Sequence, residues 1–213
     1  TRLPIVTGSA RPETIHDFGG FPEELYRLCY PAPGAPDLAQ RIKEQVTKAG
    51  IATGIDAGRG LDHGAWVPLL TLFPKADIPV LQLSVQPERC ARHHFALGAA
   101  IASLADENVL IIASGHMTHN LMDYMRPGGV RPTQASSDFR EWVHARLMNG
   151  DDSALFDWDH AAPGAKSAHP SPEHFLPLFV ALGASGEKRR TEWLGGGWIG
   201  EALAADNYLF EAD

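Results

Sequence analysis

The sequence has few cysteines and no long apolar run. Cys29 and Cys90 stand far apart among the 213 residues. They could pair, but two thiols do not make a disulfide framework, and a reducing cytoplasm is the simpler interpretation. No apolar run approaches the ~20 residues of a membrane span, and no positively charged start leads into an apolar stretch as in a secretory signal. These absences favour a cytoplasmic protein without a membrane partner.

Basic residues are also in short supply. The chain has 18 Lys and Arg against 26 Asp and Glu, which gives a net charge of −8. A protein that binds the phosphate backbone of nucleic acid needs a basic patch, so nucleic acid is not an expected partner. The hydrophobic content of 44% and the length of 213 residues suit one domain, 1–213.

Strands and helices are predicted to alternate along the chain, with a mostly parallel or mixed central sheet flanked by helices: an α/β fold. Strands are expected at Leu3–Thr7, Ile51–Ile55, Ile78–Val85 and Asn108–Ala113, and helices at Pro22–Tyr30, Pro36–Ala49, Gly64–Phe73, Arg89–Ala105, Ser136–Met148 and Pro172–Leu182. Asp37 is a candidate N-cap of the second helix, and Gly50 stands where a glycine commonly ends one.

Ten histidines are present, and several stand in loops beside predicted elements. His116 and His119 follow the expected strand Asn108–Ala113, where Gly115 would let the chain turn sharply. In open α/β sheets, ligands bind at the carboxyl ends of strands. Three further loops carry histidine, in His16-Asp17, in Asp62-His63 and in the stretch from His169 to His174. Asp62 could orient the adjacent imidazole of His63, although neighbouring side chains often point apart. Each histidine alone could be a loop residue bonded to backbone, but together they favour a shared metal or acid/base site.

Six motifs resemble one enzyme family in their order and spacing: TIHDFGGFP, YPAPG, DHGAW, PVLQLS, ASGHMTHNL and SPEHFLPL. They are similar to the class III, LigB-type extradiol ring-cleavage dioxygenases, in particular to the DOPA 4,5-dioxygenase-like branch. The ending DNYLF also resembles that branch, so the resemblance runs from about Thr14 to the end.

The resemblance implies an enzyme that opens a catechol ring beside its two hydroxyls with O₂. It also implies one divalent metal as cofactor, Fe(II) or Zn(II). A catechol binds the metal through both of its oxygens, and O₂ takes a further position. Only one face of the metal is then left for about three protein ligands. An imidazole near the ring would take up and return protons.

The resemblance also implies roles for individual residues. His174 resembles the metal ligand near the C-terminus, and His119 the histidine that faces the substrate, as acid/base group or as a further metal contact. His63 resembles the second catalytic histidine. Substrate contacts are expected from His16, Asp17, Phe18 and Trp66, although the aromatic rings could equally belong to the core.

The other polar candidates have weaker claims. Glu173 is an alternative ligand beside His174, but consecutive helical side chains diverge by about 100°, so only one should face the metal. The remaining histidines are expected to be solvated or to cap a helix: His116, His93, His94, His144 and His160.

The sequence departs from the family pattern in one respect. The family's first two metal histidines lie in a Gly-His-Gly-Ser-Pro loop and a Ser-Ala-His-Trp strand end, and neither motif is in these 213 residues. We therefore expect a catalytic domain that is incomplete at its N-terminus, with the missing ligands either truncated or supplied by a separate segment. A protein that does not hold metal in the family's way is the alternative, and a homo-oligomer stays open as a partner.

Two other classes of function remain open at this point. A zinc hydrolase would need a carboxylate base, for which Glu173 or Asp62 is available. A LigB-like module that only binds peptides would not require His63, His119 and His174 together. The dioxygenase is therefore the first hypothesis, the hydrolase the second and the binding module the third.

Overall fold

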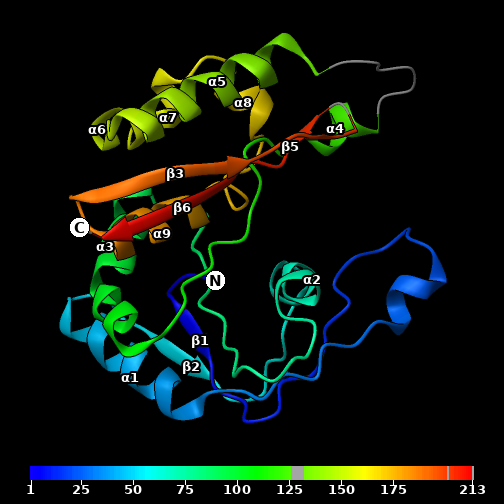
Figure 1. Cartoon of the computed structure of the whole chain (residues 1–213), viewed down its shortest axis with the longest axis vertical. Helices are drawn as coiled ribbons and strands as arrows, with labels where there is room; N and C mark the ends of the chain where they lie inside the picture. The colour runs from blue at the N-terminus through cyan, green and yellow to red at the C-terminus, as the bar shows by residue number, and fades with distance from the viewer. Residues whose placement is uncertain (126–131, 201, 213) are drawn as a thin grey trace. The chain divides into compact units, whose positions relative to one another are not determined.

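The computed structural model describes residues 1–125, 132–200 and 202–212. It divides into two compact units, Thr1–Gln86 and Pro87–Asp213 (Figure 1). Both units combine helices with short strands, so the predicted α/β class is confirmed. Within the described residues the strands pair two by two, in one parallel and two antiparallel sheets, and not in a single central sheet.

In the first unit, a parallel strand pair packs against one helix. Strands β1 (Ile5–Thr7) and β2 (Gly54–Asp56) are hydrogen-bonded in parallel, and helix α1 (Pro36–Lys48) contacts both. The backbone at 82–84 pairs with β1 as well, since the Thr7 N–H donates to the Gln82 carbonyl at 2.9 Å. These contacts bury the apolar face of α1.

Helix α1 follows from its apolar spacing. The buried residues on one face recur three and four positions apart, as an amphipathic helix requires; they are Ala39, Ile42 and Val46. Gly50 ends the helical segment with a φ of +83°, as predicted. The predicted N-cap was wrong, because Ala35 occupies the cap position and Asp37 lies in the first turn, where its charge favours the positive end of the helix dipole.

A second core of the first unit surrounds helix α2 (His63–Leu72). Trp66 projects from α2 into this core, with 1% of its surface exposed, and its Nε1–H donates to the Ile15 carbonyl at 2.9 Å. The buried members of this core are Tyr30, Ala32, Leu61, Trp66, Leu69 and Ala76. The loop at 14–30, which includes the 3-10 helix η1 (Glu23–Arg27), is thereby tied to α2.

In the second unit, an antiparallel strand pair lies between helices. Strand β3 (Arg189–Gly195) pairs with β6 (Asn207–Ala212). Helix α5 (Gln134–Asn149) contacts β3, and α9 (Pro177–Ser185) contacts β6, on opposite sides of the pair in Figure 1. The other elements of this unit are α3 (Ala91–Ala100), η2 (Ala102–Glu107), α4 (Leu121–Tyr124), α6 (Asp152–Leu155), α7 (Trp158–Ala161), α8 (Ala165–Ala168), β4 (Trp198–Ile199) and β5 (Leu203–Ala204).

Helices α3 and α9 approach each other at two glycines. A Cβ added at Gly98 would lie 2.0 Å from the Val180 carbonyl oxygen, and one added at Gly183 would lie 1.9 Å from the Phe95 carbonyl oxygen. Each glycine therefore lets the backbone of its helix touch the backbone of the other. The pair fixes α9, and α9 follows the turn that carries His174.

Two predicted strands were wrong. In the segment Ile78–Val85, only Leu83 forms an isolated bridge, to Val6. The segment Asn108–Ala113 has no strand partner within the described residues, and Leu110 is 65% exposed. An apolar, β-branched run predicts extended backbone, but a strand also needs a hydrogen-bonded neighbour, which the run itself cannot specify.

Most other elements are confirmed with shifted ends. The elements expected at Leu3–Thr7, Ile51–Ile55, Pro36–Ala49, Gly64–Phe73 and Ser136–Met148 are β1, β2, α1, α2 and α5. Three expected helices differ more from the structure: Pro22–Tyr30 holds only the short η1, Arg89–Ala105 is divided between α3 and η2, and Pro172–Leu182 becomes helical only from Pro177. Local sequence marks the helices but not where tertiary contacts end them.

Cys29 and Cys90 form no disulfide, and both thiols are exposed. The sequence left a pairing of these two thiols open, and the structure holds both as free cysteines. Among the described residues, no helix combines the length and apolar character that a bilayer crossing requires.

The glycine contacts between α3 and α9 generate a stability prediction. Gly98→Ala and Gly183→Ala should each lower the free energy of unfolding by about 1–3 kcal/mol, because the added methyl group forces two backbones apart. Alanine favours a helix over glycine by about 1 kcal/mol, so helix propensity alone would predict a gain of stability in both variants. A measured loss would therefore report the backbone clash. Gly197→Ala is the matched control, since a Cβ there meets nothing within 4 Å. Urea unfolding of the three variants measures the effect, and equal stability of all three would contradict the packing argument.

Candidate metal centre and histidine sites

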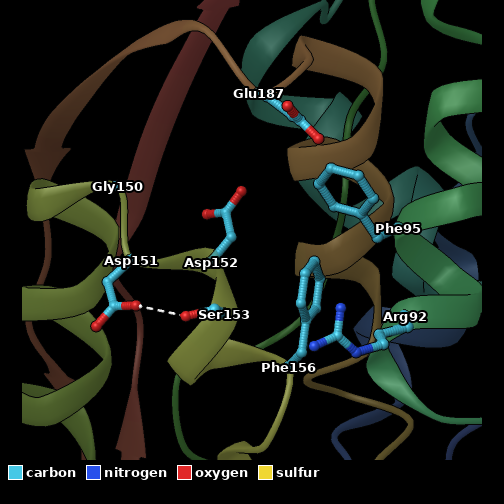
Figure 2. A pocket seen from close by; sticks show the side chains of 8 residues that line it. All are labelled: Arg92, Phe95, Gly150, Asp151, Asp152, Ser153, Phe156 and Glu187. Atoms are coloured by element: carbon cyan, nitrogen blue, oxygen red, sulfur yellow. Dashed lines mark hydrogen bonds between the residues drawn. The ribbon is translucent and has the colours of Figure 1, made fainter.

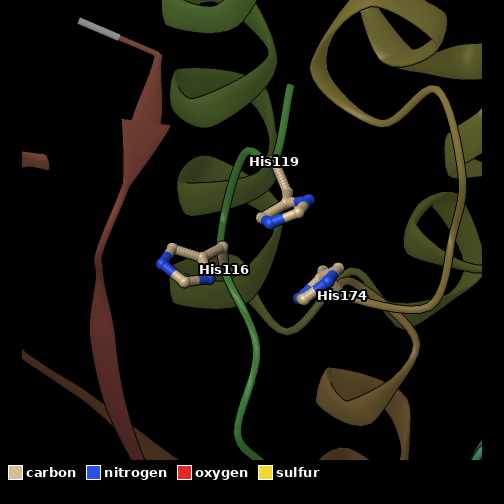
Figure 3. Close-up of side chains that lie close together, drawn as sticks. All are labelled: His116, His119 and His174. Atoms are coloured by element: carbon tan, nitrogen blue, oxygen red, sulfur yellow. The ribbon is translucent and has the colours of Figure 1, made fainter. Parts of the chain in front are cut away.

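Three histidine side chains lie together in the second unit (Figure 3). His116 and His119 come from the segment before α4, and His174 from the turn before α9. Each offers one ring nitrogen, and the three atoms lie within 4.8 Å of one another, half-buried. The rings of His119 and His174 are stacked, with centroids 3.5 Å apart. We call these three residues the histidine cluster.

The backbone holds the two halves of the histidine cluster together. The His116 N–H donates to the His174 carbonyl at 3.0 Å, and the His119 N–H donates to the Ala168 carbonyl at 2.8 Å. A Cβ at Gly115 would lie 2.2 Å from the same His174 carbonyl oxygen. Gly115 has no positive φ, so its role is this close approach and not the sharp turn that the sequence suggested.

Thr118 anchors the same segment to strand β5. Its buried hydroxyl donates to the Ala202 carbonyl at 2.8 Å and accepts from the Ala204 N–H at 2.9 Å. Thr118 thus satisfies its polar group inside the core while the flanking histidine rings remain half-buried. The buried residues Met117 and Thr118 thus lie between the two half-buried imidazoles of this segment.

A fourth histidine, His169, supports the histidine cluster from the core. It is buried against the rings of Phe139, Trp158 and Phe175. Its Nε2 donates to the Met117 carbonyl at 2.9 Å. Burial lowers the pKa of His169 to about 4, although the hydrogen bond to Met117 acts in the opposite direction. His169 is therefore a neutral donor near pH 7.

Of the two adjacent candidates, His174 and not Glu173 joins the histidine cluster. The Glu173 carboxylate accepts a hydrogen bond from the Ser171 hydroxyl at 2.7 Å. Burial raises the pKa of Glu173, but this bond and the nearby imidazoles outweigh burial and hold it below its ordinary value. Glu173 thus places a negative charge beside the cluster without offering a ligand atom to it.

The structure corrects three expectations about histidines. His116 is half-buried in the histidine cluster and is not a solvated loop residue. His94 is buried, with its Nδ1 bonded to the Cys90 carbonyl at 3.0 Å. His144 bonds the Tyr208 hydroxyl at 2.8 Å and is half-buried. The spacing of two histidines three apart could have marked His116, whereas the partners of His94 and His144 depend on tertiary packing.

Two other expectations about histidines agree with the structure. His160 is exposed between Asp157 and Asp159, and these three exposed side chains form no enclosed site. His93, which was expected at the surface or capping a helix, lies in the first turn of α3 and is partly exposed. Burial lowers the pKa of His93, and nearby Arg89 lowers it further.

In the first unit, His63 pairs with a carboxylate. His63 is the first residue of α2, and its Nδ1 lies 2.8 Å from the Asp17 Oδ1, which also accepts the His63 backbone N–H at 3.1 Å. The sequence neighbour Asp62 was considered as the group that orients this ring. Its carboxylate instead accepts from Gln82 at 2.7 Å and from Arg59 at 3.0 Å.

The other predicted substrate residues surround this pair. The His16 ring lies 5.5 Å from the Trp66 ring, and its Nε2 bonds the Leu28 carbonyl at 2.9 Å. Phe18 meets the His63 ring edge-on, with centroids 5.9 Å apart. Because Trp66 is buried, it supports His16 and Phe18 from beneath. The pair Asp17–His63 therefore lies beside a wall of aromatic rings.

A pocket of about 500 Å³ in the second unit carries carboxylates and not imidazoles (Figure 2). The rings of Phe95 and Phe156 meet edge to face in it, 5.2 Å apart. Arg92 lies over the Phe156 ring, and Arg189 binds both carboxylate oxygens of Asp152. None of the predicted site residues lines this pocket, and two of its carboxylates, Asp151 and Asp152, form ion pairs with arginines.

Residues 3–211 match the protein family described as the catalytic LigB subunit of aromatic ring-opening dioxygenase. The chain belongs to the LigB family. The match covers nearly all of the sequence, so it includes the histidine cluster as well as the Asp17–His63 pair. The family resemblance predicted from the six motifs is thereby confirmed.

Named relatives agree with this membership. A 4,5-DOPA dioxygenase extradiol of Beta vulgaris is 46% identical over 201 residues, which cover 93% of this chain and 74% of that protein. A protein of the same name from Escherichia coli K12 is 42% identical over 188 residues, 86% of this chain and 68% of that protein. The crystal structure of an uncharacterized protein from Escherichia coli K12 superimposes with a TM-score of 0.79 at 32% identity, over 97% of this chain and 80% of that one.

This LigB protein is therefore an extradiol ring-cleaving dioxygenase, a non-haem metal enzyme that acts on a catechol-type ring with O₂. The first hypothesis from the sequence is confirmed over the hydrolase and the binding module.

The buried His169 generates a pH prediction. Its pKa of about 4 in the folded protein lies below the ordinary 6.5, so the unfolded chain binds a proton that the folded chain does not. Stability should thus fall as the pH drops from about 6.5 towards 4. Between pH 7.5 and pH 5, the parent protein should lose about 2 kcal/mol more of its unfolding free energy than His169→Gln. Urea unfolding of chelator-treated protein measures this, and equal pH dependence of the two proteins would contradict it.

Proposed function

We propose that this enzyme opens the ring of a DOPA-like catechol beside its two hydroxyls, with one divalent metal, Fe(II) or Zn(II), at the histidine cluster. The observation that carries the proposal is the convergence of three imidazole nitrogens within 4.8 Å of one another. The names of the relatives from Beta vulgaris and Escherichia coli support the substrate class. Because the family match runs through both compact units, the proposal treats 1–213 as one catalytic domain.

The residues of the histidine cluster fit such a metal. Imidazole suits both iron and zinc. Two nitrogens that each bind one metal at about 2.1 Å lie at most about 4.2 Å apart, so small ring rotations bring atoms within 4.8 Å into range. When bound, the metal would supply Lewis-acid activation of the catechol oxygens and a route for electrons to O₂.

Within the histidine cluster, we assign His174 as a metal ligand and His119 to proton transfer, with direct metal contact as the alternative for His119. His119 would accept a proton from a catechol hydroxyl as the substrate binds and return one later in the reaction. Imidazole suits both directions because it ordinarily titrates near neutral pH. His116 offers a third nitrogen, which the sequence reasoning missed.

The first unit supplies the remaining assigned groups. We assign His63 as the second catalytic histidine, hydrogen-bonding an oxygen of the substrate. Phe18 and His16, backed by Trp66, would pack the aromatic ring of the substrate. Asp17 is hydrogen-bonded to the ring of His63 at 2.8 Å. A reducing cytoplasmic location belongs to the proposal, and the two free, exposed thiols support it.

The metal assignment predicts the behaviour of His174→Ala. Removing one of few ligands should eliminate most of the bound metal, because even loss of an outer-shell partner commonly costs about 10–100-fold in affinity. Metal content of purified protein after loading with Fe(II) or Zn(II) measures this. His93→Ala is the matched control, a partly exposed histidine outside both groups of described side chains that could hold a metal ion, and it should leave metal content unchanged. Full metal content in His174→Ala would overturn the assignment, and Glu173→Gln would be tested next.

The assignment of His119 predicts a different pattern. His119→Gln should keep most of its metal while ring opening slows by about 10²–10⁴-fold, the contribution of a positioned acid/base group. Oxygen uptake and the yellow ring-opened product report the rate. If His119→Gln loses metal as completely as His174→Ala, His119 is a ligand and the acid/base role passes to His63. Unchanged turnover would remove both roles.

A further inference from the structure

Asp17 and His63 form a hydrogen-bonded side-chain pair in the first unit. Forty-six positions separate the two residues, so the fold alone creates their contact. One oxygen of Asp17 receives both the ring and the backbone of His63, at 2.8 and 3.1 Å. The opposite ring nitrogen, Nε2, has no hydrogen bond to any described residue, and 43% of the His63 side chain is exposed.

We propose that Asp17 is a positioning residue that holds His63 with its proton on Nδ1, so that Nε2 presents a lone pair as a base. This proposal rests on the proposed catalytic role of His63. Nε2 would accept the proton of a substrate hydroxyl, and the resulting imidazolium would keep its Nδ1–H bond to the carboxylate until Nε2 returns the proton. Asp17 would then act through His63 and not by binding the substrate itself.

The charge of Asp17 supports this tautomer. Burial raises the pKa of Asp17, but the hydrogen bonds from the His63 ring and backbone outweigh burial and hold it below its ordinary value. Asp17 is therefore ionised near neutral pH. An ionised carboxylate only accepts hydrogen bonds, so the bonded ring nitrogen must carry the hydrogen. A neutral imidazole with its hydrogen on Nδ1 leaves Nε2 as the acceptor.

The surrounding backbone keeps both partners in place. The Ile15 N–H donates to the Leu61 carbonyl at 2.7 Å, and the Leu61 N–H donates to the Glu13 carbonyl at 2.8 Å, so the segments preceding Asp17 and His63 are paired. A Cβ at Gly60 would lie 2.1 Å from the Glu13 carbonyl oxygen, so this approach requires glycine. Phe18 meets the imidazole edge-on and limits its rotation.

Asp17 has a second, structural task. It accepts the backbone N–H of the first residue of α2, while the N-cap residue Asp62 makes no side-chain capping bond. A loss of stability after mutation would therefore not prove a positioning role. Asp17→Asn separates the two tasks, because asparagine keeps an oxygen for the His63 N–H but lacks the charge and brings an NH₂ that can donate to Nδ1.

Nitrogen NMR of the imidazole rings tests the proposal directly. In ¹⁵N-labelled protein loaded with Zn²⁺, the signals of His63 are those that disappear in His63→Gln. We expect the Nδ1–H tautomer to be the major neutral form in the parent protein and the minor form in Asp17→Asn. Asp62→Asn is the matched control: it removes a carboxylate adjacent to His63 that bonds Gln82 and Arg59, and it should leave the tautomer unchanged. Equal tautomer populations in Asp17→Asn and the parent would overturn the proposal, even if unfolding showed a loss of stability.

Steady-state oxygen uptake with DOPA as the probe tests the consequence. Asp17→Asn should lower kcat by about 10–100-fold with a smaller change in KM, as loss of a group that orients an imidazole does, while Asp62→Asn stays near the parent. If His63→Gln and Asp17→Asn both turn over at the parent rate, the proposal is overturned together with the catalytic role of His63. The metal and His119 assignments would stand in that case, because their variants are measured separately.

Discussion

The close backbone approach of Gly115 to His174 is the contact on which the proposed metal centre depends. The His116 N–H donates to the His174 carbonyl, and a side chain at residue 115 would collide with that same oxygen. Two segments distant in sequence are thereby held with their imidazoles facing one another. A hydrogen bond between backbones is short and directional, so it sets the spacing of the rings more tightly than packing of long side chains would.

Glycines also permit close backbone contacts at other points of the molecule. Gly60 lies against the Glu13 carbonyl beneath the Asp17–His63 pair, and Gly98 and Gly183 bring helices α3 and α9 into backbone contact. In each case a missing Cβ permits an approach that no other residue allows. Both groups of candidate histidines therefore stand on rigid backbone contacts, as a preorganised site requires.

The polar side chains around these sites differ in how deeply they are buried, and their roles differ accordingly. His169 lies in the aromatic core and stays neutral, so it serves as a fixed donor beneath the histidine cluster. The rings of the cluster are half-buried, where they retain access for ligands. Carboxylates lie near both groups of imidazoles: Glu173 accepts a hydrogen bond from Ser171 beside the histidine cluster, and Asp17 bonds His63 directly. Negative charge near these imidazoles would favour a bound cation.

The sequence alone determined the α/β class, the family, and the residue types of the chemistry. Helix α1 was readable because its apolar spacing and Gly50 are local signals, and the motifs around His119 and His174 carried the resemblance. Only the tertiary structure decided which groups meet. It added His116 to the cluster, replaced Asp62 by Asp17 as the partner of His63, and left Asn108–Ala113 without a strand partner in the described residues. The reason is physical: local propensity depends on neighbours along the chain, whereas a ligand set, a hydrogen-bonded pair or a sheet depends on residues that only folding brings together.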